Sequence, residues 1–276
     1  MTVEICSETF GERGDPAVLL IMGAMASMLW WPDEFCRRLA DAGRFVIRYD
    51  HRDTGRSTSY EHGRPGYTGS DLVLDAVAVL DAHDVPAAHV VGVSAGGAFA
   101  QALALDFPDR VVSLVLISSS PVVPIERPLP PPDAAFMRFF ATTQVDWSDA
   151  SSVIEYTVAY ARMLAGAERR FDEAAMRELV RRDVERARDF AAVQNHDSIP
   201  HGTPPGGSLA SIGARTLVIH GSADPMFPAE HGRALADEIG SARLMTLEGA
   251  GHGVDRADWD TLAQAIVDHT TTKELP

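Results

Sequence analysis

The feature that most constrains the fold of this chain is a serine, Ser94, flanked by glycines between an apolar run and a helical pattern. The run H-V-V-G-V at residues 89–93 has the composition of a buried strand, and residues 95–105 have the apolar spacing of a helix. In G-V-S-A-G-G, at residues 92–97, the small neighbours permit a turn so sharp that the serine side chain stands above the end of the strand. This strand–turn–helix unit predicts a nucleophilic serine in an α/β fold.

Apolar runs of strand length alternate with helical patterns along most of the chain. The runs cover residues 18–23, 45–50, 89–93 and 111–117, and strand patterns resume at residues 216–221 and 243–248. Helical patterns cover residues 71–83, 95–105 and 258–269. Because strands and helices alternate, we expect a mostly parallel sheet flanked by helices on both faces.

A helical insertion interrupts this alternation between two linkers rich in proline and glycine. The linkers are residues 121–133 and 199–208, and helical patterns between them cover residues 134–141, 148–165 and 172–194. We expect an α/β core made of residues 1–120 and 211–276, and an all-helical cap made of residues 121–210. An insertion at this point of such a sheet commonly covers a ligand site at the carboxyl ends of the strands.

A nucleophilic serine needs a base, and the base needs an acid that orients it. His252, in G-A-G-H-G after the last predicted strand, is the candidate base, and Asp224, in the turn after residues 216–221, is the candidate acid. The chain order Ser, Asp, His is the one that this architecture uses. Glu126 is a distant second candidate for the acid. His196 and His201, at the exit of the insertion, can line a cleft, but a structural or exposed role is favoured for both.

The negative charge that develops on a carbonyl oxygen needs two hydrogen-bond donors. The backbone N–H of Ala95, directly after the serine, is one candidate, and the N–H of Ala24 in M-G-A-M is the other. Large apolar side chains near these loops and in the insertion are candidates for a substrate pocket. They are Met25, Trp30, Phe139, Tyr160, Met226 and Phe227.

The composition excludes several kinds of partner. A formal net charge of −15 repels polyanions, so we expect neither nucleic acid nor an anionic membrane as a partner. The longest apolar stretch, residues 17–32, is interrupted by glycine and proline and is too short to cross a bilayer. Cys6 and Cys36 are too few for a disulfide framework and match no metal-ligand spacing, so no metal is expected. The first residues lack the pattern of a signal peptide, so a cytoplasmic protein is expected, and a homodimer stays open.

Several motifs together resemble the α/β-hydrolase superfamily. Y-D-H-R-D-T-G-R-S, at residues 49–57, resembles its D-x-R-x-x-G-x-S loop, and M-G-A, G-V-S-A-G-G, the Asp224 turn and G-A-G-H extend the likeness to all of the chain outside the insertion. W-P-D-E-F and R-R-L-A-D are similar to stretches of methylesterases that act on anthracycline polyketides. The resemblance implies that Ser94, His252 and Asp224 form a triad without a cofactor, with Ala24 and Ala95 as the oxyanion donors. It also implies that the usual first edge strand is missing, because the chain starts near the position of the second strand.

The expected function is hydrolysis of an apolar small-molecule ester through an acyl-enzyme. A methyl ester of a bulky polyketide-like acid is one such substrate, although the insertion, which resembles these enzymes much less, determines the substrate. Lactonases, C–C bond hydrolases, thioesterases and cofactor-free perhydrolases use the same triad and stay open as alternatives. A ligand-binding protein without catalytic activity is a remote alternative, because such proteins usually lose the serine or the histidine.

Overall fold

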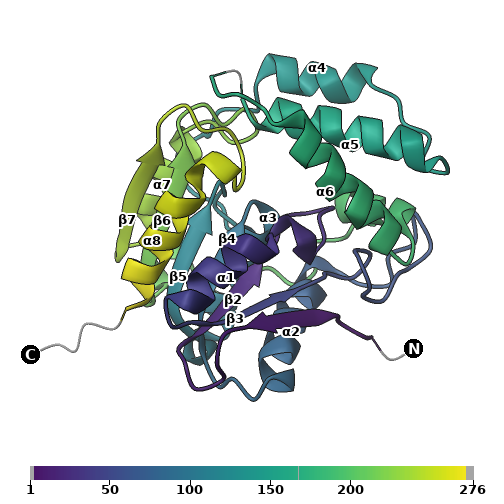
Figure 1. Cartoon of the computed structure of the whole chain (residues 1–276). Coiled ribbons are helices and arrows are strands. Elements are labelled where there is room, and N and C mark those ends of the chain that lie inside the picture. The colour runs from purple at the N-terminus through teal and green to yellow at the C-terminus, as the bar shows by residue number, and fades with distance from the viewer. Residues whose placement is uncertain (1–2, 167, 272–276) are drawn as a thin grey trace, which may run out of the picture.

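The computed structural model describes residues 3–166 and 168–271, and a seven-stranded sheet lies at its centre (Figure 1). The spatial order is β1-β3-β2-β4-β5-β6-β7; β1 is antiparallel to β3, and all other neighbours are parallel. The strands are β1 (Ser7–Phe10), β2 (Ala17–Ile21), β3 (Phe45–Tyr49), β4 (Ala88–Val93), β5 (Val111–Ile117), β6 (Arg215–Gly221) and β7 (Ala242–Leu247). The predicted mostly parallel α/β sheet is therefore confirmed.

Helices cover both faces of the sheet, and a third group of helices lies above the carboxyl ends of its strands (Figure 1). The helices are α1 (Asp33–Asp41), α2 (Gly69–Ala82), α3 (Ala95–Asp106), α4 (Ala134–Thr142), α5 (Ala150–Leu164), α6 (Glu173–Arg186), α7 (Glu230–Glu238) and α8 (Trp259–Thr270). Helices α4, α5 and α6 lie together above the sheet in Figure 1, between β5 and β6 in the sequence. These helices fall within residues 121–210; that this segment forms a unit of its own stays a prediction.

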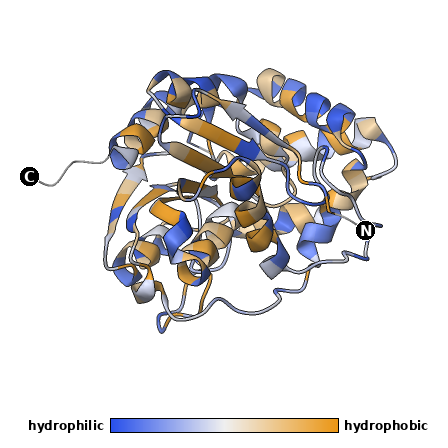
Figure 2. Ribbon diagram, turned by 90° about the horizontal axis from the view of Figure 1, so that it is seen from below, coloured by the Kyte–Doolittle hydropathy of each residue, from blue (hydrophilic) through white to orange (hydrophobic). Residues whose placement is uncertain are grey.

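Alternate residues of each inner strand pack into two separate cores, one on each face of the sheet. In β2, Leu19 and Ile21 pack with residues of α2, α3 and α7, whereas Val18 and Leu20 pack with residues of α1 and α8. Both faces are buried, so the inner strands form nearly continuous apolar runs rather than alternating apolar and polar residues. Figure 2 shows these apolar strands enclosed by helices of mixed hydropathy.

The structure differs from the sequence-based expectation in a few elements. The helix expected over residues 172–194 ends at Arg186, because the backbone N–H of Arg188 donates to the carbonyl of Gly55, and a 3-10 helix, η3 (Phe190–Asp197), follows. Helices α1 and α7 and strand β1 were not expected. Within the described residues, β1 lies at the edge of the sheet and pairs with β3 alone. None of the helices in residues 3–166 and 168–271 is long and apolar enough to span a membrane.

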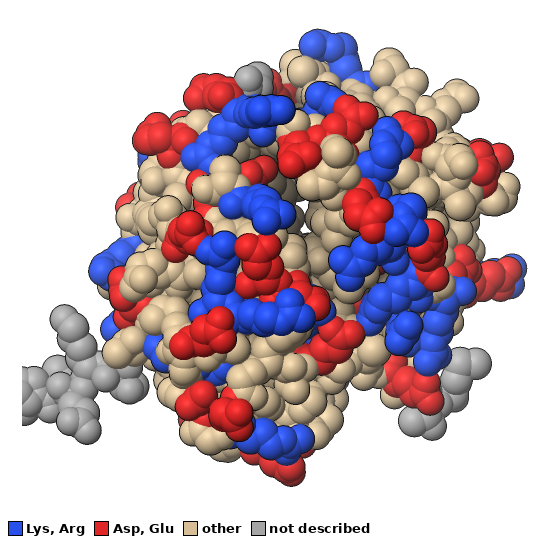
Figure 3. Space-filling model, viewed as in Figure 1, with Lys and Arg blue, Asp and Glu red and all other residues tan. Residues whose placement is uncertain are grey.

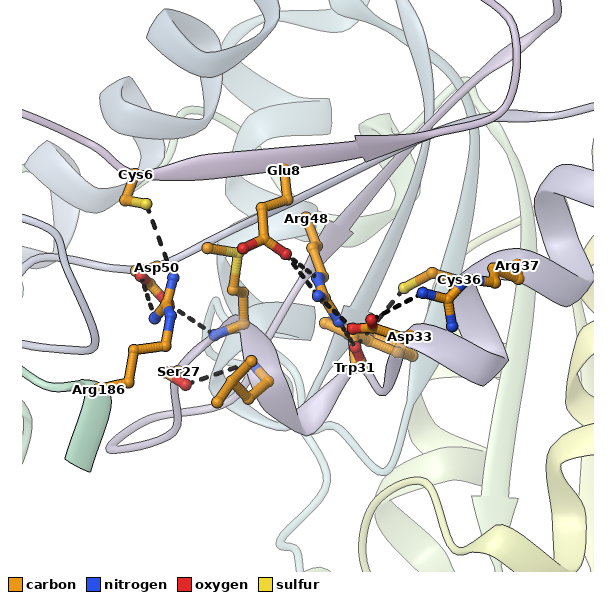
Figure 4. Close-up of polar contacts among 12 residues, drawn as sticks. Cys6, Glu8, Ser27, Trp31, Asp33, Cys36, Arg37, Arg48, Asp50 and Arg186 are labelled. Atoms are coloured by element: carbon orange, nitrogen blue, oxygen red, sulfur yellow. Dashed lines mark hydrogen bonds and ion pairs between the residues drawn. The ribbon is translucent and has the colours of Figure 1, made fainter. Parts of the chain in front are cut away.

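A buried carboxylate, Asp50, links residues 121–210, called here the helical segment, to the loop after β2 (Figure 4). One oxygen accepts the N–H of Met28 at 2.9 Å, and the other accepts the N–H of Arg56 at 2.9 Å and Nη1 of Arg186, the last residue of α6, at 2.7 Å. The neighbouring guanidinium of Arg48 lies between Glu8 and Asp33 in the same view. Since Asp50 is fully buried, its charge depends on these donors for stabilisation.

We predict that Asp50→Ala lowers the free energy of unfolding by about 3–5 kcal/mol, because it removes the charged partner of Arg186 and leaves its Nη1 and two amides without an acceptor. Urea denaturation measures the change. Asp237→Ala is the matched control, because it breaks an ion pair with Arg127 in which both side chains are well exposed. It is expected to cost less than about 1 kcal/mol. Equal losses in the two variants would contradict the role of Asp50.

Candidate active site

Ser94 occupies the turn between β4 and α3 with a backbone that few residues adopt. Its φ is 54° and its ψ is −121°, outside the favoured regions for a residue with a side chain. The turn is held by hydrogen bonds: the N–H of Ser94 donates to the carbonyl of Ile117 in β5, and its carbonyl accepts Oγ of Ser119 at 2.9 Å. Strain of this kind costs about 1–3 kcal/mol and persists only where its surroundings fix it.

The glycines around Ser94 are required by the close approach of neighbouring backbone. A Cβ atom on Gly92 would lie 2.3 Å from the carbonyl oxygen of Gly96. A Cβ atom on Gly96 would lie 2.3 Å from the carbonyl oxygen of Ile21 at the end of β2. The pattern G-x-S-x-G therefore follows from packing between β4, α3 and β2.

His252 and Asp224 lie in the loops after β7 and β6 and are hydrogen-bonded to each other. Nδ1 of His252 is 2.8 Å from Oδ2 of Asp224, which leaves Nε2 as the ring nitrogen available for proton transfer. The other carboxylate oxygen accepts the backbone N–H groups of Met226 and Phe227 at 2.9 and 2.8 Å. Glu126, the second candidate for the acid, is exposed in the linker after β5.

The surroundings of Asp224 favour its charged form. Burial by itself would raise the pKa of Asp224, but the charge of His252, its hydrogen bond and the Phe227 amide together hold that pKa below its usual value. His220 adds support, because its Nε2 lies 2.7 Å from the carbonyl oxygen of Phe227 and so fixes the turn that presents the two amides. The carboxylate can therefore stay charged beside the imidazole and stabilise an imidazolium.

Two unpaired backbone amides lie beside Ser94. The N–H groups of Ala24 and Ala95 have no hydrogen-bond acceptor among the described residues, and both alanines line the same cavity as Ser94 and His252. Ala95 begins α3, so its N–H belongs to the positive end of the helix. The loop and the serine are close: a Cβ atom on Gly23 would lie 3.8 Å from Oγ of Ser94.

A cavity of about 1000 Å³ opens above these groups, between the loops at the carboxyl ends of the strands and helices α5 and α6. Five of the six predicted substrate-binding residues line it, namely Met25, Trp30, Tyr160, Met226 and Phe227. Phe139 does not line it, which corrects that prediction: its ring packs on Tyr156 and Tyr160, and Phe140, next in α4, contributes to the wall instead. Figure 3 shows the molecule hollowed near the centre of one face, with side chains of both charge signs around the hollow.

Comparisons with known proteins show the family to which the chain belongs. The family described as alpha/beta hydrolase fold matches residues 16–254. The rhodomycin D methylesterases DauP of Streptomyces sp. (strain C5) and DnrP of Streptomyces peucetius are 38% and 36% identical to this chain, over 97% of it and 95% of each relative. This chain belongs to the α/β-hydrolase family. The similarity bears out the resemblance to methylesterases that act on anthracycline polyketides, a group that includes aclacinomycin methylesterase, and the names of both relatives agree with the expected ester hydrolysis.

Solved structures show the same α/β-hydrolase fold. A hydrolase from Pseudomonas aeruginosa PA01 is 28% identical, with a TM-score of 0.70, and the match covers 97% of this chain and 92% of that one. A meta-cleavage product hydrolase from Pseudomonas fluorescens IP01 has a TM-score of 0.74 at 20% identity, over 97% of this chain and 94% of that one, and supports the fold alone. In the described part of this α/β-hydrolase, no group of three or more His, Cys, Asp or Glu side chains is placed to hold a metal ion.

The sequence did not reveal that His196 binds the loop at residues 22–25, which carries the candidate oxyanion donor Ala24. Nδ1 of His196 accepts the N–H of Met25 at 2.9 Å, and its Nε2 lies 2.8 Å from the carbonyl oxygen of Arg52. An amide can only donate and a carbonyl can only accept, so the ring is neutral with its proton on Nε2. Burial, and then the charge of His51, lowers the pKa of His196 to about 4, which keeps the ring in this form.

The contact with His196 matters because Met25 has an unfavourable backbone. Its φ is 63°, in the left-handed region that a residue with a side chain rarely adopts. The hydrogen bond to His196 fixes this residue and, with it, the neighbouring N–H of Ala24. A second contact of the same kind links the helical segment to the other side of the site: the N–H of His252 donates to the carbonyl of Leu164, at the end of α5, at 2.7 Å.

We predict that Gly23→Ala lowers kcat by about tenfold or more, because small displacements of reacting groups have effects of this size. The new Cβ atom would lie 3.3 Å from Cβ of Ser94, so the serine or the loop must shift. Gly213→Ala is the control, since a Cβ atom there meets nothing within 4 Å. Steady-state kinetics on one ester compares the two variants, and an unchanged kcat in folded Gly23→Ala would refute the prediction.

A second prediction concerns His196. His196→Ala removes the acceptor for the Met25 amide, so kcat should fall about tenfold and the free energy of unfolding by about 1–3 kcal/mol. His196→Asn offers a carbonyl oxygen near the position of Nδ1 and should recover most of kcat. Kinetics and thermal denaturation of both variants provide the measurement. If the asparagine variant is as impaired as the alanine variant, the hydrogen bond to Met25 is not what supports catalysis.

Proposed function

We propose that this chain is a carboxylic-ester hydrolase that forms an acyl-enzyme on Ser94. The observation that carries the proposal is the 2.8 Å hydrogen bond between His252 and Asp224, beside a cavity that Ser94, His252 and the amides of Ala24 and Ala95 line together. A nucleophile, an oriented base and two unpaired donors are the parts that acyl transfer requires.

In the first step, Oγ of Ser94 attacks the ester carbonyl carbon while Nε2 of His252 takes the hydroxyl proton. The negative charge on the carbonyl oxygen is stabilised by the N–H groups of Ala24 and Ala95, which donate to no other group among the described residues. The charged carboxylate of Asp224 stabilises the imidazolium. The intermediate then collapses: the bond to the alkoxy group breaks, and His252 delivers its proton to the departing alcohol.

In the second step, water replaces the alcohol. Nε2 of His252 takes a proton from the water, and the oxygen attacks the acyl carbon under the same two amides. Collapse returns the proton to Oγ of Ser94 and releases the carboxylic acid. One ester and one water molecule thus give one acid and one alcohol, and the protein is regenerated.

The proposed substrate class is a methyl ester of a bulky, polyketide-like acid. The cavity volume of about 1000 Å³ and its aromatic wall, including Trp30, Tyr160 and Phe227, suit a large apolar acyl group. Two relatives that are 38% and 36% identical over 97% of this chain are named rhodomycin D methylesterases. The same triad could hydrolyse lactones, thioesters or C–C bonds, or form peracids. No observation favours one of these reactions over ester hydrolysis.

We further infer that the enzyme works in the cytoplasm on a small molecule. Cys6 and Cys36 are both free thiols, as is usual in a reducing compartment. The net charge of −15 disfavours nucleic acid and anionic membrane surfaces as partners. A homodimer is compatible with these properties and is tested by light scattering.

The proposal predicts that the wild type hydrolyses methyl esters of polycyclic aromatic acids with a higher kcat/KM than methyl acetate. Ser94→Ala should lower kcat by about 10⁴-fold or more, as expected for loss of the nucleophile. Titration of released acid follows the reaction. Turnover that survives in Ser94→Ala would refute the acyl-enzyme, and saturable binding of the esters without turnover would favour a ligand-binding protein.

A further inference from the structure

The separation of Ser94 and His252 depends on the backbone that carries each of them. Within residues 3–166 and 168–271, no hydrogen bond joins Oγ of Ser94 to the imidazole of His252, whose Nδ1 binds Asp224. The bond between nucleophile and base commonly tightens only when a substrate is present. The turn of Ser94 and the loop of His252 must therefore be placed by other residues.

Ser118 and Ser119 follow β5 directly, at the centre of the sheet. β5 pairs with β4, which leads to Ser94, and with β6 on its other side. The N–H of Ser94 donates to the carbonyl of Ile117 at 3.0 Å, and the N–H of Ser118 donates to the carbonyl of Ile219 at 2.9 Å. The two serines are 1% and 0% exposed, so their hydroxyl groups require partners inside the protein.

The hydroxyl of Ser119 fixes the peptide group that follows the nucleophile. Its Oγ donates to the carbonyl of Ser94 at 2.9 Å, and the N–H of Gly97 in the first turn of α3 donates to the same oxygen at 2.9 Å. This carbonyl and the N–H of Ala95 belong to one planar peptide group, so a donor to the carbonyl also orients that N–H. A Cβ atom on Gly97 would lie 2.5 Å from Oγ of Ser119, so the hydroxyl fits closely against α3.

The hydroxyl of Ser118 holds the loop of the base. Its Oγ accepts the N–H of Gly253, the residue after His252, at 3.1 Å. Ser118 has a φ of 45°, in the left-handed region that a residue with a side chain rarely adopts. Strained residues of this kind persist only where the surrounding structure fixes them, and they are concentrated at functional sites.

We propose that Ser118 and Ser119 are positioning residues for the reaction: Ser119 fixes the nucleophile together with its oxyanion donor, and Ser118 fixes the base. The proposal rests on the proposed function, since these groups act in acyl transfer at Ser94. Neither serine exchanges a proton with the substrate, because each acts through a backbone group. As the two are adjacent in the chain, the connection after β5 sets the separation of Oγ of Ser94 from Nε2 of His252.

The first test compares the methyl and p-nitrophenyl esters of naphthoic acid. His252 acts as a base with both esters, but it must also protonate the departing methoxide, whereas p-nitrophenolate leaves without a proton. Ser118→Ala should therefore lower kcat/KM by about tenfold for the methyl ester and by only about threefold for the p-nitrophenyl ester. Ser119→Ala should lower both by about tenfold, because both oxyanions need the N–H of Ala95.

Ser113→Ala is the matched control, because it removes another buried hydroxyl of β5, which is hydrogen-bonded to Nδ1 of His89 at 2.8 Å. Its melting temperature should fall, as for any lost buried hydrogen bond, but its kcat/KM for both esters should stay within about twofold of the wild type. Equal losses of kcat/KM in all three variants would show a general effect of lost buried hydrogen bonds and overturn the proposal.

Ser118→Gly tests the hydroxyl without the strain. Glycine adopts a φ of 45° readily, so this variant folds even if Ser118→Ala does not. Its kcat/KM should fall more for the methyl ester than for the p-nitrophenyl ester, by factors similar to those of Ser118→Ala. An unchanged ratio between the two esters in Ser118→Gly would show that the hydroxyl does not hold the base, and would overturn the role of Ser118.

Labelling with phenylmethylsulfonyl fluoride separates the two serines from the esterase. Oγ of Ser94 forms a bond to sulfur, fluoride leaves and His252 takes the hydroxyl proton; mass spectrometry follows the product. Ser118→Ala and Ser119→Ala should react more slowly than the wild type by about threefold or more, and Ser113→Ala at the wild-type rate. Labelling that depends on both serines, with no turnover of any ester, would refute the proposed function and leave the positioning role standing. Equal labelling of all four proteins would overturn that role, whichever esters are hydrolysed.

Discussion

The backbone of Ser94 sets the geometry on which the rest of the site depends. A serine with φ of 54° between a strand and a helix is stable only if the neighbouring strands hold it, and β5 does so through the carbonyl of Ile117. The helix must then start close against β2, which leaves no space for a side chain at Gly96. Because β2, β4, β6 and β7 run parallel, the loops that follow them lie at the same end of the sheet. Residues far apart in the sequence therefore reach the serine.

Features encoded locally were predictable from the sequence. The inner strands, the turn at Ser94 and the loops of Asp224 and His252 lie within a few residues of their expected places, because buried parallel strands form nearly continuous apolar runs. Strand β1 was missed because S-E-T-F has no such run and forms only by pairing with β3. The end of α6 and the contact of His196 with Met25 were also missed, since both depend on backbone groups more than 100 positions away along the chain.

Two buried carboxylates near the site are stabilised in different ways. Asp224 receives two backbone amides and one imidazole, so its charge is balanced by donors from its own turn and from the loop after β7. Asp50 receives two amides and the guanidinium of Arg186, which belongs to α6. The donors to Asp224 all come from loops at the carboxyl ends of the strands, whereas the donors to Asp50 include a residue of the helices above the sheet.

The hydrogen bonds that Leu164 and His196 accept have a consequence for how such enzymes diversify. Each joins the helical segment to a loop of the reaction centre, one at His252 and the other at Met25. A helical segment recombined from a distant relative would bring its own cavity wall but would also have to supply a carbonyl and an imidazole at these two points. Substrate range in this lineage should therefore change by substitutions that spare both contacts more readily than by exchange of the whole segment.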